Sequence, residues 1–147
     1  MNTTDYRKEL SNQDHDLLLK FPAYISLLAA NADGTLDKDE LFAANELARI
    51  KNFSCHLILE DFYKEVTLNF ESTLLNLDKS LPIGKDGRFV AIKTELVNIE
   101  KIMLKLGDEY TSIMHKSMRA FKDHVSNAHH NVLVDFIFPI PIKGLSY

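Results

Sequence analysis

The chain has 147 residues, of which 46% are hydrophobic and 26% are charged, with 5 Gly, 4 Pro and a formal net charge of −4. This size and composition predict one globular domain, residues 1–147, that buries its own core, and they disfavour a disordered chain. The negative net charge excludes a general attraction to nucleic acid or to an anionic membrane surface.

The N-terminal segment, residues 1–13, is polar and is predicted to be flexible. It contains no apolar core of a signal peptide, and no run of 18 apolar residues elsewhere predicts a membrane span. The single Cys55 cannot form an internal disulfide. These features predict a cytoplasmic protein.

Apolar side chains recur every three or four residues between Leu17 and Ala32, a spacing that predicts a helix. Pro22 is expected near its first turn, where the missing N–H costs little. After the Asp33-Gly34 turn, Asp37 and Glu40 have the spacing of a capping box, which predicts the start of a second helix. The apolar stripe of this helix is formed by Leu41, Ala44, Leu47, Ala48 and Ile50. The two segments together predict a helical hairpin.

A large apolar and aromatic stripe predicts a third helix, with Ser54 as its N-cap. Its members are Ile58, Phe62, Val66, Phe70, Leu74 and Leu77. Pro82, Gly84 and the Asp86-Gly87 pair then predict a loop.

A heptad-like seam follows this loop, formed by Phe89, Ile92, Leu96, Ile99, Met103, Leu106 and Tyr110. The apolar stripe changes phase next to Gly107-Asp108, which predicts two helices separated by a sharp bend, although helical drift contributes to such a step. Residues 136–147 contain Pro139 and Pro141 and are predicted to be extended. The predicted fold is therefore all-α, a single compact bundle of about five to seven helices with an extended, Pro-containing C-terminal tail.

The stretch AANADGTLDKDE, residues 29–40, matches most of a calcium-binding helix-loop-helix loop. When Gly34 is aligned with the glycine of that motif, the ligand positions are occupied by Asn31, Asp33, Thr35, Asp37 and Glu40. These oxygen donors suit Ca²⁺ or Mg²⁺. Ala29 stands at the first ligand position and has no donor atom, so any such site is incomplete and weak. A capped turn between two helices explains the same residues without an ion.

The run from Leu17 to Ile50 resembles the tellurite-resistance TerB-like family, through Ala32-Asp33-Gly34 followed by Asp37, Asp39 and Glu40. The resemblance covers about a quarter of the chain. It implies an all-helical bundle, a divalent-cation site at the acidic turn and an association with bacterial stress responses or membrane-linked complexes. It implies no catalytic residues.

Four of the six histidines fall late in the sequence, at His115, His124, His129 and His130. Their spacing along a helix does not bring them to one metal ion, and the chain lacks the Glu-x-x-His pairs of di-iron bundles. A metal site that the fold assembles from His129-His130 with His56 or a carboxylate stays open. A catalytic site is therefore not predicted.

The apolar tail is expected to be covered, by its own bundle first, by another subunit or a protein partner next, and by a membrane last. Its large apolar side chains are Phe136, Ile137, Phe138, Ile140, Ile142 and Leu145. Two functions are predicted. The first is a non-enzymatic, TerB-like stress-response protein of bacteria with a weak cation site. The alternative is a structural or scaffold bundle without metal that self-associates or binds a protein partner.

Overall fold

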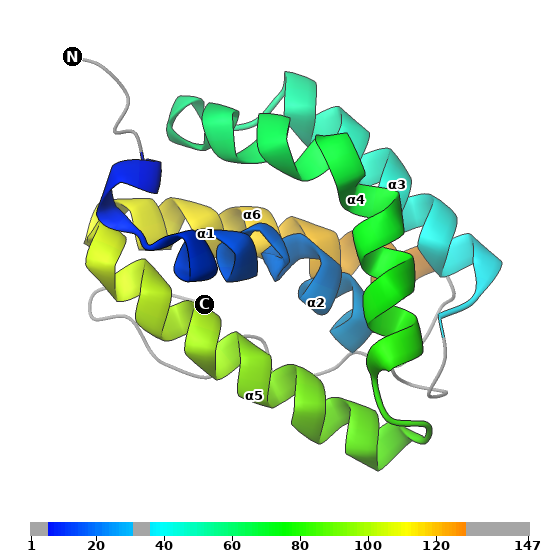
Figure 1. Cartoon of the computed structure of the whole chain (residues 1–147). Helices are drawn as coiled ribbons and strands as arrows, with labels where there is room; N and C mark the ends of the chain where they lie inside the picture. Colours follow the sequence, from blue (N-terminus) through cyan, green and yellow to red (C-terminus); the bar gives the residue numbers. More distant parts are fainter. Residues whose placement is uncertain (1–5, 31–35, 129–147) are drawn as a thin grey trace.

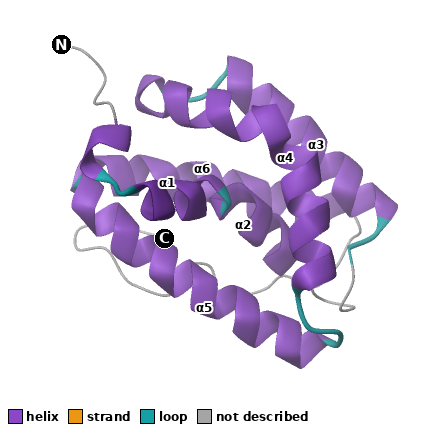
Figure 2. Cartoon of the chain, in the orientation of Figure 1, coloured by secondary structure: helices purple, strands orange, loops and turns teal. Residues whose placement is uncertain are grey.

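A computed structural model describes residues 6–30 and 36–128, and within these residues the chain is all-helical, without a strand (Figures 1 and 2). This confirms the predicted fold class. The α-helices are α1 (Asn12–Leu19), α2 (Phe21–Ala29), α3 (Lys38–Phe53), α4 (Glu60–Ser80), α5 (Lys85–Met103) and α6 (Asp108–Ala128). Short 3-10 helices are η1 (Tyr6–Glu9), η3 (Leu57–Leu59) and η4 (Leu104–Leu106). The predicted extended tail, residues 136–147, lies outside the described residues.

Helix α2 lies in the middle of the bundle, and the other helices are arranged around it (Figure 1). All 9 of its residues are buried, as expected for a helix that is apolar on every side. The buried helix includes the polar residue Ser26, whose hydroxyl donates a hydrogen bond to the carbonyl oxygen of Pro22 at 2.8 Å. Burial of this hydroxyl therefore leaves its donor satisfied.

The predicted helix from Leu17 to Ala32 is interrupted. Helix α1 ends at Leu19 and α2 begins at Phe21, with Lys20 between them. Pro22 lies in the first turn of α2, as predicted. Because Pro22 has no N–H, it cannot continue the hydrogen-bond ladder of α1, and the chain starts a new helix there.

The stripe predicted along residues 58–77 is confirmed as the buried face of α4, whose buried members include Phe62, Val66 and Phe70. Ser54 was expected to begin this helix, and that prediction is wrong. Ser54 ends α3, because its N–H and its hydroxyl both bond to the carbonyl oxygen of Ile50 at 3.0 Å.

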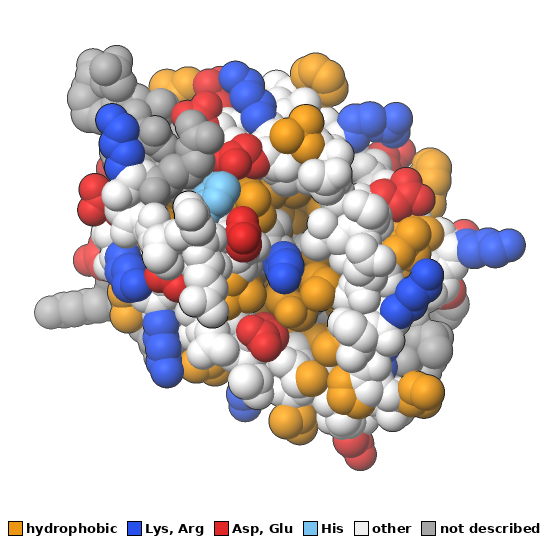
Figure 3. Space-filling view, in the orientation of Figure 1, with side chains coloured by type: hydrophobic (Ala, Val, Ile, Leu, Met, Phe, Trp, Pro, Cys, Tyr) orange, Lys and Arg blue, Asp and Glu red, His pale blue; other side chains and the backbone are white. Residues whose placement is uncertain are grey.

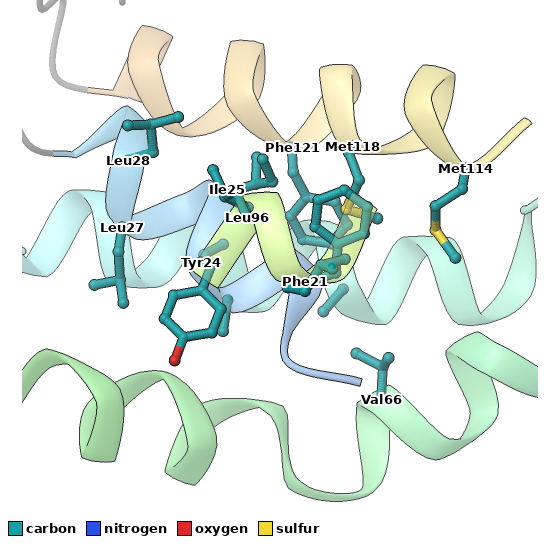
Figure 4. Close-up of a cluster of buried hydrophobic side chains, with 14 of the residues drawn as sticks. Phe21, Tyr24, Ile25, Leu27, Leu28, Val66, Leu96, Met114, Met118 and Phe121 are labelled. Carbon is teal, nitrogen blue, oxygen red and sulfur yellow. The ribbon is translucent and has the colours of Figure 1, made fainter. Parts of the chain in front are cut away.

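The predicted seam, which runs along α5 to the first turn of α6, packs inside the bundle's own core, with Ile92, Leu96, Ile99, Met103 and Tyr110 all buried. It therefore offers little surface to another copy of the chain. In this core, side chains of α2 meet those of α6 (Figure 4), whose buried members include Met114, Met118 and Phe121.

The predicted bend between the last two helices is confirmed at Gly107, which has φ of +93°. Glycine adopts such a conformation without steric cost, so it can end η4 and let α6 start in a new direction. The hydroxyl of Thr111 supports the bend, because it donates hydrogen bonds to the carbonyl oxygens of Gly107 at 2.8 Å and Met103 at 3.1 Å. The predicted loop before α5 is shorter than expected, since Asp86 and Gly87 already belong to that helix. None of the helices described here combines the length and the hydropathy needed to cross a bilayer.

Candidate functional site

The predicted cation site is only partly covered by the structure, because Asn31, Asp33 and Thr35 lie outside the described residues. Asp37 and Glu40 form the predicted capping box at the start of α3. The N–H of Glu40 donates to Asp37 Oδ1 at 2.8 Å, and the N–H of Asp37 donates to Glu40 Oε1 at 2.9 Å. The side chain of Glu40 is completely buried. These two residues therefore have a structural role in starting the helix, whether or not an ion binds.

Across residues 6–30 and 36–128, no three or more His, Cys, Asp or Glu side chains are grouped closely enough to hold a metal ion. The described histidines are dispersed instead. His56 accepts a hydrogen bond from the N–H of Ile58 at the start of η3, and His124 lies 3.4 Å from Glu46. His129 and His130 lie outside the described residues.

His115 forms a buried pair with Glu100, between α6 and α5. Its Nε2 atom lies 2.9 Å from Oε1 and 2.8 Å from Oε2 of Glu100, and neither side chain is more than 1% exposed. Burial raises the pKa of Glu100, and the hydrogen bond from His115 offsets part of that rise. Because the pair is closed to solvent, a substrate cannot reach it, and we assign it to the core.

Sequence reasoning missed this pair because its members lie on different helices. A signal existed in the spacing of the apolar residues. Glu100 follows Leu96 by four residues, and His115 precedes Met118 by three, so each polar side chain falls on a buried helix face. Two buried polar positions on adjacent helices are expected to pair, because an unpaired one is costly.

A groove of about 370 Å³ lies between α3 and α4. It is lined by Phe42, Asn45, Glu46, Ala48, Arg49, Asn52, Thr67, Phe70 and Glu71. The lining combines aromatic rings, side-chain amides and charges of both signs. Its side chains can bind a ligand by apolar contact and by hydrogen bonding.

Large apolar side chains are exposed along the same side of α3. Phe42 is 65% exposed, Ile50 is 46% exposed and Phe53 is 83% exposed. Ile50 was expected in the buried stripe, and that prediction is wrong, because α3 packs on the bundle through its small residues Ala44 and Ala48. Hydrophobic and charged side chains alternate on the α3 and α4 side of Figure 3. We call Phe42, Ile50 and Phe53 the α3 apolar face.

Two polar features mark the groove. The Nε2 atom of His124, in the last turns of α6, lies 3.4 Å from Glu46 Oε1 and links that helix to the groove wall. The Oδ1 atom of Asn52 is buried and has no hydrogen-bond partner among the described residues. An acceptor of this kind is costly to leave unbonded, and it can receive an N–H from a bound segment.

A smaller hollow of about 230 Å³ lies between α1 and α4, where α4 is kinked at Asn69. Its lining is Asp16, Leu19, Lys20, Glu65, Val66, Asn69, Phe70 and Thr73. It lacks the exposed aromatic side chains that flank the α3–α4 groove, which is therefore the better candidate site.

Comparisons with protein-family models, with curated proteins and with solved structures found no match to this chain. Any functional assignment therefore rests on the geometry of the groove and of the acidic turn.

Proposed function

We propose that this protein is a non-enzymatic helical bundle that binds a segment of a protein partner in the α3–α4 groove. The observation that carries the proposal is the α3 apolar face beside the groove, with Phe42 and Phe53 mostly exposed. Exposed aromatic side chains that flank a groove are typical of a protein interaction site. They are also the residues that contribute most to binding free energy at such sites.

The groove's polar lining favours a polypeptide over a nucleic acid. Asn45 and Asn52 supply amides that can bond to a peptide backbone, and Arg49 is balanced by Glu46 and Glu71. A phosphate backbone needs an excess of positive charge, which this lining does not provide. An apolar helix or an extended peptide is the ligand that the groove fits best.

Retention of partners on immobilised protein tests the proposal. The test variant is Phe42→Ser combined with Phe53→Ser, and the control is Leu104→Ser, an exposed apolar position on η4. A genuine partner is retained by the wild type and the control, is lost with the double variant, and shows the same difference in affinity when purified. If every retained protein binds the double variant equally well, the proposal is wrong.

The second candidate is the TerB-like function, with weak binding of Ca²⁺ or Mg²⁺ at Asn31, Asp33, Thr35, Asp37 and Glu40. What favours it is the order of elements. Helix α2 ends at Ala29 and α3 begins at Lys38, so the acidic residues join two helices, as the family resemblance implies. The thermal unfolding midpoint of chelator-treated protein, measured with and without millimolar calcium or magnesium, tests this candidate.

A further inference from the structure

The described helices leave the side chains of the α3 apolar face exposed. Phe42 and Phe53 lie eleven residues apart, about three helical turns, and therefore project from the same side of α3. The opposite side is already used, because Ala44, Leu47 and Ala48 are buried in the core. Something outside the described helices must cover the exposed side if its apolar surface is to leave water.

The chain itself contains a segment with the right chemistry. Residues 129–147 carry only two formal charges, at Asp135 and Lys143, and are otherwise rich in apolar residues. Pro139 and Pro141 predict an extended backbone. In an extended segment alternate side chains share a face, so Phe136, Phe138, Ile140 and Ile142 can present one continuous apolar edge.

The segment starts next to the groove. Helix α6 ends at Ala128, four residues or about 6 Å beyond His124. The His124 side chain contacts Glu46, which lines the groove. A tethered segment that begins this close has an effective concentration in the millimolar range at the groove, so even weak contacts suffice for binding.

The groove also offers polar partners to an extended backbone. The buried Oδ1 atom of Asn52 can accept an N–H of the segment. Arg49 can pair with Asp135, the one acidic residue of the segment.

From this combination we infer that residues 132–145 dock in the α3–α4 groove of their own chain, with apolar side chains of the segment on the α3 apolar face. A protein partner must then displace the segment, and this consequence rests on the proposed function. The docking itself does not require a partner.

Site-specific photo-crosslinking of the full chain tests the inference. p-Benzoylphenylalanine replaces Phe42, the purified protein is irradiated at micromolar concentration, and crosslinked peptides are identified by mass spectrometry. We expect an intramolecular crosslink, at the mass of a single chain, to a peptide within residues 132–145. The same probe at Leu104 is the matched control, and its yield to this segment should be at least about tenfold lower.

A second pair of variants separates docking from chance contact. Phe138→Ser combined with Ile140→Ser, in the chain that carries the probe at 42, should reduce the crosslink several-fold, whereas Ser146→Ala should not. If the probe at Phe42 disturbs folding by circular dichroism, Phe53 provides a more exposed position for it. The inference is overturned by crosslinks confined to dimers, which would mean that a second copy covers the groove, or by the absence of any crosslink to the segment from both positions. Neither result bears on partner retention, so failure of the inference is distinguishable from failure of the proposed function.

Discussion

The carboxylate of Glu100 on α5 and the imidazole of His115 on α6 meet at 2.8 Å, where both side chains are closed to solvent. Fifteen residues separate the two in the sequence, and the bend at Gly107 brings them together. A buried ionisable pair of this kind makes the stability of the bundle depend on pH and on each partner.

The pH dependence has a defined sign. Burial raises the pKa of Glu100 in the folded protein above its ordinary value of 4.5, so the folded state holds the proton more tightly than the unfolded state. The contribution of protonated Glu100 to the free energy of unfolding is fully present below pH 4.5, and it is lost as the pH rises through the raised pKa of the folded state. Glu100→Gln, which stays neutral, should therefore gain stability relative to the wild type as the pH rises toward neutrality. Urea unfolding across that range measures the difference.

The control for this measurement is Glu71→Gln, because Glu71 is an exposed carboxylate on α4. Its free energy of unfolding should keep a nearly constant difference from that of the wild type over the same range. A constant difference for Glu100→Gln as well would contradict the linkage.

Removal of the other partner should be more damaging. His115→Ala leaves the Glu100 carboxylate buried without its hydrogen-bond donor, which should reduce the free energy of unfolding by about 3–5 kcal/mol. Adding Glu100→Gln to this variant should restore part of the loss, because the buried charge is removed. A double-mutant cycle in urea measures the coupling, and additive effects of the two substitutions would show that the pair does not interact in solution.

The capping box can be tested without any ion. Asp37→Ala removes the oxygen that accepts from the N–H of Glu40, so it should lower the free energy of unfolding by about 1 kcal/mol in chelator. Asp37→Asn keeps a side-chain oxygen at the N-cap and should cost less. Urea unfolding compares the two, and equal losses would argue against the cap as the source.

A bound cation would add a separate effect. If the acidic turn binds calcium, millimolar calcium should raise the unfolding midpoint of the wild type, since an ion that binds only the folded state stabilises it. Asp37→Asn should weaken this rise, whereas Asp39→Asn, at a position outside the predicted ligand set, should retain it. The absence of a rise in the wild type at millimolar calcium or magnesium would leave the turn with its capping role only.

Arg88 joins the last turn of α4 to the first turn of α5. Its Nη2 atom lies 2.6 Å from Asp78 Oδ1, and its Nη1 atom donates to the carbonyl oxygen of Asp78 at 3.1 Å. Because the Arg88 side chain is nearly buried, Arg88→Ala should cost about 1.5–3 kcal/mol, and Arg88→Lys should recover little, since an ammonium group lacks the forked geometry. Urea unfolding measures both, with the exposed Lys79→Ala as control. Full recovery by Lys would indicate that charge alone matters.

The spacing of apolar residues in the sequence does not predict the α3–α4 groove. The spacing around Leu47 and Ala48 placed Ile50 in the buried stripe, but α3 is covered on its small-residue side, and Ile50 is left partly exposed. The spacing places Phe42 and Phe53 opposite the buried side of α3, and hence on the surface, but it does not predict a groove beside them. Which side of a helix is covered depends on the neighbours that dock on it, and those neighbours come from distant parts of the chain.

The sequence by itself determined the helical class, the capping box at Asp37 and Glu40, the buried stripe of α4 and the bend at Gly107. Each follows from interactions within a few residues: side chains one helical turn apart, a cap three residues away, a glycine free to adopt positive φ. The tertiary structure alone decided that Glu100 meets His115, that the seam of α5 is used inside the bundle, and that α3 exposes an aromatic face. These outcomes depend on contacts between helices, whose free energies are set by packing and burial that no local pattern contains.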